Sequence, residues 1–229
     1  MNIYADLLFG YAVHAYLKIG DEKPDLEGGQ GDAMATIVFS ATAAEVFINE
    51  VGALAVQDVK RLDSRDNITL FVRMWNELGA RTSAKAKFIL AKTILTDEPY
   101  DQQAQPFQDY ATLLTLRDEL LHMPKPEATY VDEGLIKTKP WQFVEEKLGP
   151  RNLLADCDPA VKGWLYRVTT KAMARWACET IEAMVKSLIR STPQSMFGGS
   201  LDLFYFRQFS LPDSTSTSST DSTPPASSQ

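Results

Sequence analysis

The chain has 229 residues, of which 45% are hydrophobic and 23% are charged, and it carries a net charge of −7 with a pI near 4.9. This composition is typical of one globular domain that is long enough to bury a core. The acidic balance excludes a surface that binds polyanions generally, so contact with nucleic acid would need a local basic site or a groove between two copies.

The N-terminal segment, residues 1–31, is predicted to be a helical segment followed by a glycine-rich loop. Asp6, His14 and Lys18 interrupt its apolar part, and no basic stretch comes before it. A membrane span needs about 20 consecutive apolar residues, and a secretion signal starts with basic residues. We therefore expect a cytoplasmic protein without a membrane segment, and a structural role for His14.

Helical periodicity dominates residues 32–192. In the first long helix, apolar residues recur at steps of four and three, as on one face of a helix: Ile37, Ala41, Ala44, Ile48, Val51 and Ala55. Further helices are predicted over residues 68–78, 83–95, 106–122, 141–148 and 159–189. The only strand-like fragment, Ala-Thr-Tyr-Val around Tyr130, is too little for a sheet. The pattern predicts an all-α helical bundle.

The C-terminal part divides into an apolar extension, residues 193–210, and a tail, residues 211–229, of almost only Ser, Thr, Pro, Asp and Ala. Such a tail cannot bury enough apolar surface to offset its ordering entropy, so we expect it to be disordered. The only cysteines, Cys157 and Cys178, match no metal or redox spacing. We expect both to be reduced thiols, and we expect neither a metal ion nor a cofactor.

The helix over residues 106–122 is apolar on two sides when its residues are placed at 100° intervals. One sector contains Phe107, Tyr110, Ala111, Leu114 and Leu121, and the other contains Leu113, Leu116 and Leu120. A helix of this kind lies either at the centre of a bundle or at an interface with a partner chain.

Arg117, Asp118 and His122 lie in the last two turns of this helix. Arg117 projects into an apolar sector, where its guanidinium needs a carboxylate, a phosphate or a route to solvent. Asp118 and His122 are four residues apart, so the carboxylate could hydrogen-bond the imidazole and fix its tautomer. A structural reading pairs Arg117 with Glu45 or Glu50. A functional reading combines the arginine and the histidine for metal-free RNA cleavage.

One copy of this helix does not bring Arg117 and His122 tightly together, because they are about 140° apart around the axis and roughly 7.5 Å apart along it. A two-fold dimer through this helix would place two arginines and two histidines in one groove. The functional reading therefore predicts a homodimer.

Two stretches together resemble bacterial HEPN-like proteins, the higher-eukaryote and prokaryote nucleotide-binding helical superfamily. The first is Ala-Thr-Ala-Ala-Glu-Val-Phe-Ile-Asn-Glu at residues 41–50, and the second is Leu-Arg-Asp-Glu-Leu-Leu-His-Met-Pro-Lys-Pro at residues 116–126. The second contains the superfamily's motif of Arg, a short spacer and His, here Arg117, Asp118 and His122. The resemblance covers about residues 33–190 and leaves the N-terminal segment and the tail outside.

The resemblance implies an α-helical domain that dimerises through the motif helix and, in many members, a metal-independent endoribonuclease. His122 would then act as general acid or base, Arg117 would hold the phosphorane charge, and Asp118 would orient His122. Arg117 and Lys125 would contact RNA. Many relatives are toxins that a nucleotidyltransferase-like antitoxin neutralises, in some by modifying a tyrosine two residues after the histidine. That position is Pro124 here, so this form of regulation does not carry over.

Two other interpretations also agree with the sequence. In the first, the chain is a catalytically inactive HEPN-like module that binds RNA or protein, and the same polar residues hold a dimer together. In the second, it is a helical interaction protein whose tail is the functional element.

Overall fold

The computed structural model describes residues 4–20, 29–59, 66–79, 81–97, 99–122, 128–131, 134–137, 139–156, 163–193 and 199–212. Several sequence-based expectations concern residues outside these ranges. They include most of the glycine-rich loop, Lys125, Cys157 and the tail beyond residue 212.

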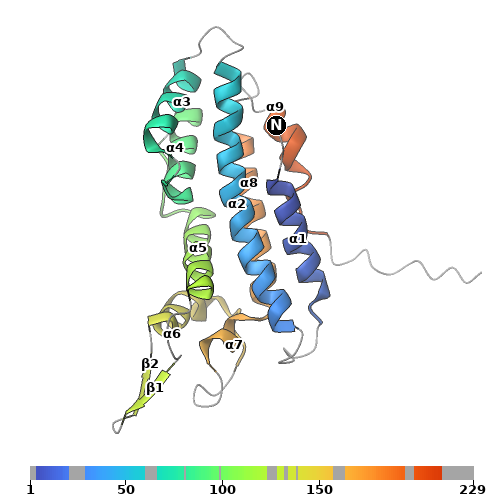
Figure 1. The fold of residues 1–229 in the computed structure, drawn as a ribbon, viewed down its shortest axis with the longest axis vertical. Helices are drawn as coiled ribbons and strands as arrows, with labels where there is room; N and C mark the ends of the chain where they lie inside the picture. Colours follow the sequence, from blue (N-terminus) through green and yellow to red (C-terminus); the bar gives the residue numbers. More distant parts are fainter. Residues whose placement is uncertain are drawn as a thin grey trace, which may run out of the picture.

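A single long helix, α2 (Gly29–Val59), runs through the middle of the molecule (Figure 1). It packs against α1 (Ala5–Lys18), α3 (Asp66–Leu78), α4 (Ala84–Thr96), α5 (Phe107–Leu121) and α8 (Lys171–Ser191). All six apolar positions that predicted this helix are fully buried. The all-α bundle expected from the sequence is therefore the observed fold.

The ends of the shorter helices follow local signals in the sequence. Helix α3 ends before Gly79, which has a φ of 71°. Glycine adopts this left-handed conformation without steric strain, because it has no Cβ atom. Helix α4 begins after Ser83, whose side chain accepts a hydrogen bond from the backbone N–H of Ala86 at 3.3 Å. These boundaries agree with the predicted helices to within two residues.

The helix predicted over residues 159–189 is wrong in one respect, because the chain breaks at Thr169 and Thr170. A short helix, α7 (Trp164–Val168), comes before the break, and α8 starts at Lys171. Thr170 has an extended backbone, and its hydroxyl accepts the N–H of Met173 at 2.9 Å and donates to the carbonyl of Leu153 at 2.8 Å. These two hydrogen bonds favour a new helix start over a continuous helix.

The segment between α5 and α7 contains the only strands among the described residues. β1 (Ala128–Val131) pairs antiparallel with β2 (Gly134–Lys137). The first was the predicted strand-like fragment, whereas the second was not predicted. This hairpin lies at one end of the molecule (Figure 1). It leads into α6 (Lys139–Phe143), the π-helical turn η1 (Val144–Leu148) and the 3₁₀ turn η2 (Gly149–Arg151).

The N-terminal helix α1 and the C-terminal extension both pack onto α2 and share its hydrophobic core. The C-terminal extension forms α9 (Gly199–Leu201) and the π-helical turn η4 (Asp202–Phe206). Its Phe209 stacks on Phe9 of α1 with 4.7 Å between ring centroids, and Phe47 of α2 meets Phe209 at 5.8 Å. The two ends of the described chain therefore contribute to the same hydrophobic core as the central helix.

The central helix is also long and apolar enough to cross a membrane by length and composition alone. More than half of its most apolar window is buried inside the protein. A helix surrounded by other helices needs this composition for packing, and the cytoplasmic location stays a prediction.

Candidate functional site

The helix that carries the motif, α5, packs against both α2 and α8. Most large side chains of its two predicted apolar sectors face the interior. Its buried residues are Phe107, Tyr110, Leu113, Leu114, Leu116 and Leu120. Leu121, which is 56% exposed, is its exposed large apolar side chain. Apart from Leu121, the large apolar side chains of both sectors are therefore buried within one chain.

Arg117 makes a two-pronged ion pair with Glu45 of α2. Its Nη1 donates to Glu45 Oε2 at 2.8 Å, and its Nη2 donates to Glu45 Oε1 at 3.0 Å. Its Nε donates to Asp118 Oδ1 at 2.9 Å. The Arg117 side chain is only 13% exposed. The hydrogen bonds to Glu45 raise the pKa of Arg117 above its ordinary value, although burial opposes them.

This arrangement selects one of the two partners proposed for Arg117 from the sequence. Glu50, the other candidate, accepts the backbone N–H of Tyr4 at 2.7 Å and the hydroxyl of Tyr205 at 2.7 Å. Arg117 therefore joins α5 to α2, while Glu50 joins Tyr4 and Tyr205 to α2.

His122 lies at the C-terminal end of α5 with an exposed side chain. Its backbone N–H donates to the carbonyl of Asp118 at 3.0 Å, but its imidazole has no hydrogen bond within the described part of the chain. The carboxylate of Asp118 binds Arg117 instead. Among the described residues, no hydrogen bond joins the Asp118 carboxylate to the His122 imidazole, and the orienting role expected for Asp118 stays a prediction. Lys125, the predicted RNA contact, lies outside the described residues.

Tyr110 lies near the ion pair between Arg117 and Glu45. From the sequence it was assigned only to the core. Its side chain is fully buried, and its hydroxyl has no hydrogen-bond partner in the described structure. Burial, and then the charge of Glu45, raise its pKa. The carboxylate of Glu45 therefore affects both a cation and a phenol inside the bundle.

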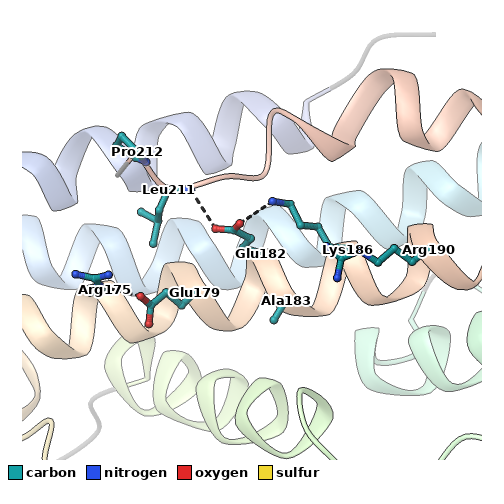
Figure 2. A pocket seen from close by; sticks show the side chains of 8 residues that line it. All are labelled: Arg175, Glu179, Glu182, Ala183, Lys186, Arg190, Leu211 and Pro212. Carbon is teal, nitrogen blue, oxygen red and sulfur yellow. Dashed lines mark hydrogen bonds and ion pairs between the residues drawn. The ribbon is translucent and has the colours of Figure 1, made fainter. Parts of the chain in front are cut away.

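A concave region with a volume of about 430 Å³ lies along α8, beside the end of the C-terminal extension. Figure 2 shows Glu182 between Lys186 and the backbone of Leu211. Glu182 accepts from Lys186 Nζ at 2.6 Å and from the Leu211 N–H at 3.0 Å. Arg175 and Glu179 form a further ion pair at 2.7 Å. Glu182 and Lys186, whose Nζ also donates to Ser210 Oγ at 2.7 Å, therefore attach the extension to α8.

Among the described residues, no three His, Cys, Asp or Glu side chains lie close enough together to hold a metal ion. Cys178 is buried, with its sulfur 3.4 Å from Ser40 Oγ, and burial raises the pKa of its thiol to about 12. A thiol in this state is not a nucleophile near neutral pH.

Comparison of the chain with protein-family models, with curated proteins and with solved structures finds no match. Membership of the HEPN-like superfamily therefore stays a prediction that depends on the quoted residues.

Proposed function

We propose that this protein is a non-catalytic helical module of HEPN-like type that binds other proteins. The observation that carries the proposal is the bonding of Arg117, whose guanidinium is held by Glu45 and Asp118. In this role Arg117 joins two helices and does not hold a phosphate.

The local charge supports this role. One guanidinium and two carboxylates sum to a charge of −1, so an approaching phosphodiester is repelled and not attracted. If a phosphate displaced Glu45, the glutamate would lose its bidentate partner at a site where only 33% of its side chain is exposed. Leaving a partly buried charge without its partner is costly.

The surface supports a protein partner over RNA. The net charge of −7 opposes binding to a polyanion. Exposed apolar side chains form a row over Tyr4, which precedes α1, and Leu7 and Tyr11 of α1. The Tyr11 ring lies 6.0 Å from that of Phe39 on α2. A second row on α3 consists of Leu70, Met74 and Leu78. Contiguous apolar side chains at a surface are typical of protein interfaces.

Metal-independent RNA cleavage by a homodimer is the second candidate, and the exposed imidazole of His122 favours it. In this reading, dimerisation through the end of α5 would bring two His122 side chains to one phosphate and would release Arg117 from Glu45. A nucleotidyltransferase-like antitoxin would then be the expected partner.

Incubation of the purified protein with total RNA in EDTA separates the two candidates. We would compare the wild type with Arg117→Ala and His122→Ala. Arg175→Ala serves as the control, because Arg175 is half exposed, pairs with Glu179 of α8 and lies outside the motif. The proposal predicts intact RNA with every variant. Cleavage by the wild type and by Arg175→Ala, but not by folded His122→Ala, would overturn it.

The homodimer is tested separately by measuring the molar mass in solution. Leu121 is the apolar residue of α5 available for a contact, so Leu121→Glu should convert a dimer that uses this helix into a monomer. Leu17→Glu on α1, where the side chain is 58% exposed and lies outside both apolar rows, serves as the control. A wild-type monomer at all concentrations would rule out the dimer.

A further inference from the structure

A pocket of about 380 Å³ lies between α2, α3 and the start of α4, away from the motif residues. Ala53 and Val56 form an apolar wall on α2, and Trp75 forms another on α3. Asn49, Asn76 and Lys87 supply the polar groups. Its volume falls within the range of roughly 300–1,000 Å³ that small-molecule sites occupy.

The wall on α3 depends on a glycine in α2. A Cβ atom on Gly52 would lie 2.1 Å from Cε2 of Trp75, far inside van der Waals contact. Only glycine therefore allows the indole to lie directly against the backbone of α2. Gly52 and the Trp75 indole both line the pocket.

Lys87 brings a positive charge to the same place. It is 6% exposed, it donates from Nζ to Asn49 Oδ1 at 2.9 Å, and its ammonium lies 5.3 Å from the centre of the Trp75 ring. The described residues that line the pocket include no acidic side chain. A lysine ammonium beside amide groups and an apolar wall is suited to an anion with an apolar body.

We propose that this pocket binds a small organic anion with an aromatic body. Lys87 and the amides of Asn49 and Asn76 bind the anionic head, and Ala53, Val56 and Trp75 contact the body. None of the residues that line this pocket belongs to the Arg117 ion pair. The proposal therefore does not depend on the proposed function.

Calorimetric titration of the full chain with benzoate and with phenyl phosphate tests the proposal. We expect dissociation constants in the millimolar range or lower. The compound that binds more tightly shows whether the site prefers a carboxylate or a phosphate head group. Acetate and inorganic phosphate test the head alone, and benzyl alcohol tests the body alone. Each of these three compounds should bind at least about tenfold more weakly, because it contains only the head or only the body and lacks the contacts of the missing part.

Two variants locate the site. Lys87→Met should weaken binding at least about tenfold, since it removes a charge-assisted contact, whereas Lys85→Met on the same helix should change it less than twofold. Ala53→Leu places a larger side chain in the apolar part of the pocket and should also weaken binding. Because Ala53 is exposed, this substitution should not disturb the core. The proposal is overturned if neither aromatic anion binds the wild type at 10 mM. Equal binding by the head groups alone, or by a folded Lys87→Met or Ala53→Leu variant, would also overturn it.

Discussion

The two carboxylates that bind Arg117 are not equivalent. Glu45 comes from another helix, makes two hydrogen bonds and is 33% exposed, whereas Asp118 is the next residue in the chain, makes one and is 57% exposed. Exposed pairs contribute little to stability because solvent screens them, but a partly buried, bidentate pair is costly to break. Most of the stability that the Arg117 cluster provides should therefore come from Glu45.

This difference gives a matched pair of substitutions. Glu45→Gln should lower the free energy of unfolding by about 1–3 kcal/mol, because it leaves the buried guanidinium without its main countercharge. Asp118→Asn should lower it by less than about 0.5 kcal/mol. Urea denaturation followed by circular dichroism measures both. Equal losses from the two substitutions would mean that Arg117 does not join α5 to α2 as described.

Cys178 provides a prediction about alkaline stability. Burial raises the pKa of its thiol from 9.0 to about 12, so between these values the folded protein holds a proton that the unfolded chain has released. The stability from the protonated thiol is complete below pH 9 and is lost as the pH rises toward 12. In this window the free energy of unfolding should fall by up to about 1.4 kcal/mol per pH unit from this group.

Denaturation of the wild type and of Cys178→Ala at pH 8, 9 and 10 isolates this contribution. Other groups that titrate in this range are the same in both proteins, so they cancel in the difference. The wild type should lose stability more steeply than the variant above pH 9. Parallel curves for the two proteins would show that the Cys178 thiol has an ordinary pKa.

At this residue scale, the sequence could predict the need of Arg117 for a partner but not the partner. Its position in an apolar sector of a helix indicated a carboxylate, a phosphate or a route to solvent, and Glu45 and Glu50 were both possible carboxylate partners. The choice depends on how α2 and α5 are rotated against each other, which is a property of the packed bundle. The pocket beside Trp75 could not be predicted either, because no periodic pattern shows that an indole lies against Gly52.

Among the helices, the break between α7 and α8 shows how a side chain can override a periodic pattern. Apolar residues continue at helical spacing across Thr169 and Thr170, and this pattern predicted one helix. The hydroxyl of Thr170 bonds both to the new helix and to the carbonyl of Leu153. The second of these bonds is a tertiary contact, so the sequence alone could not identify the break.

Substitutions at Thr170 test this account of the break. Thr170→Ala removes both hydrogen bonds and should lower the free energy of unfolding by about 1–2 kcal/mol, whereas Thr170→Ser keeps the hydroxyl and should retain most of the stability. Ser83→Ala at the start of α4 is a useful comparison, because Ser83 is exposed and makes a longer capping bond of 3.3 Å. If Thr170→Ala and Thr170→Ser were equally stable, the hydroxyl would not hold the break.

At the scale of the whole molecule, α2 holds both ends of the described chain in place. Glu50 is 8% exposed and accepts hydrogen bonds from the backbone of Tyr4 and from the hydroxyl of Tyr205. Burial, followed by the bond to Glu50, raises the pKa of Tyr205, so this phenol stays a donor over the neutral range. Aromatic contacts between Phe9, Phe47 and Phe209 lie beside it. The C-terminal extension is therefore part of the fold and not an appendage.

Two truncations of different length test this conclusion. A chain that ends at residue 198 loses the buried side chains of Leu201, Tyr205 and Phe209 and leaves Glu50 without the tyrosine hydroxyl. Deleting one large buried aromatic side chain costs about 3–5 kcal/mol, and about 1 kcal/mol corresponds to 2–4 °C in a protein of this size. We therefore expect the melting temperature to fall by at least about 10 °C. A chain that ends at residue 212 keeps all of these contacts and should melt within about 2 °C of the full-length protein. If the shorter chain melted at the same temperature as the longer one, the C-terminal extension would not contribute to the core, and α1 and α2 would have to be stable without it.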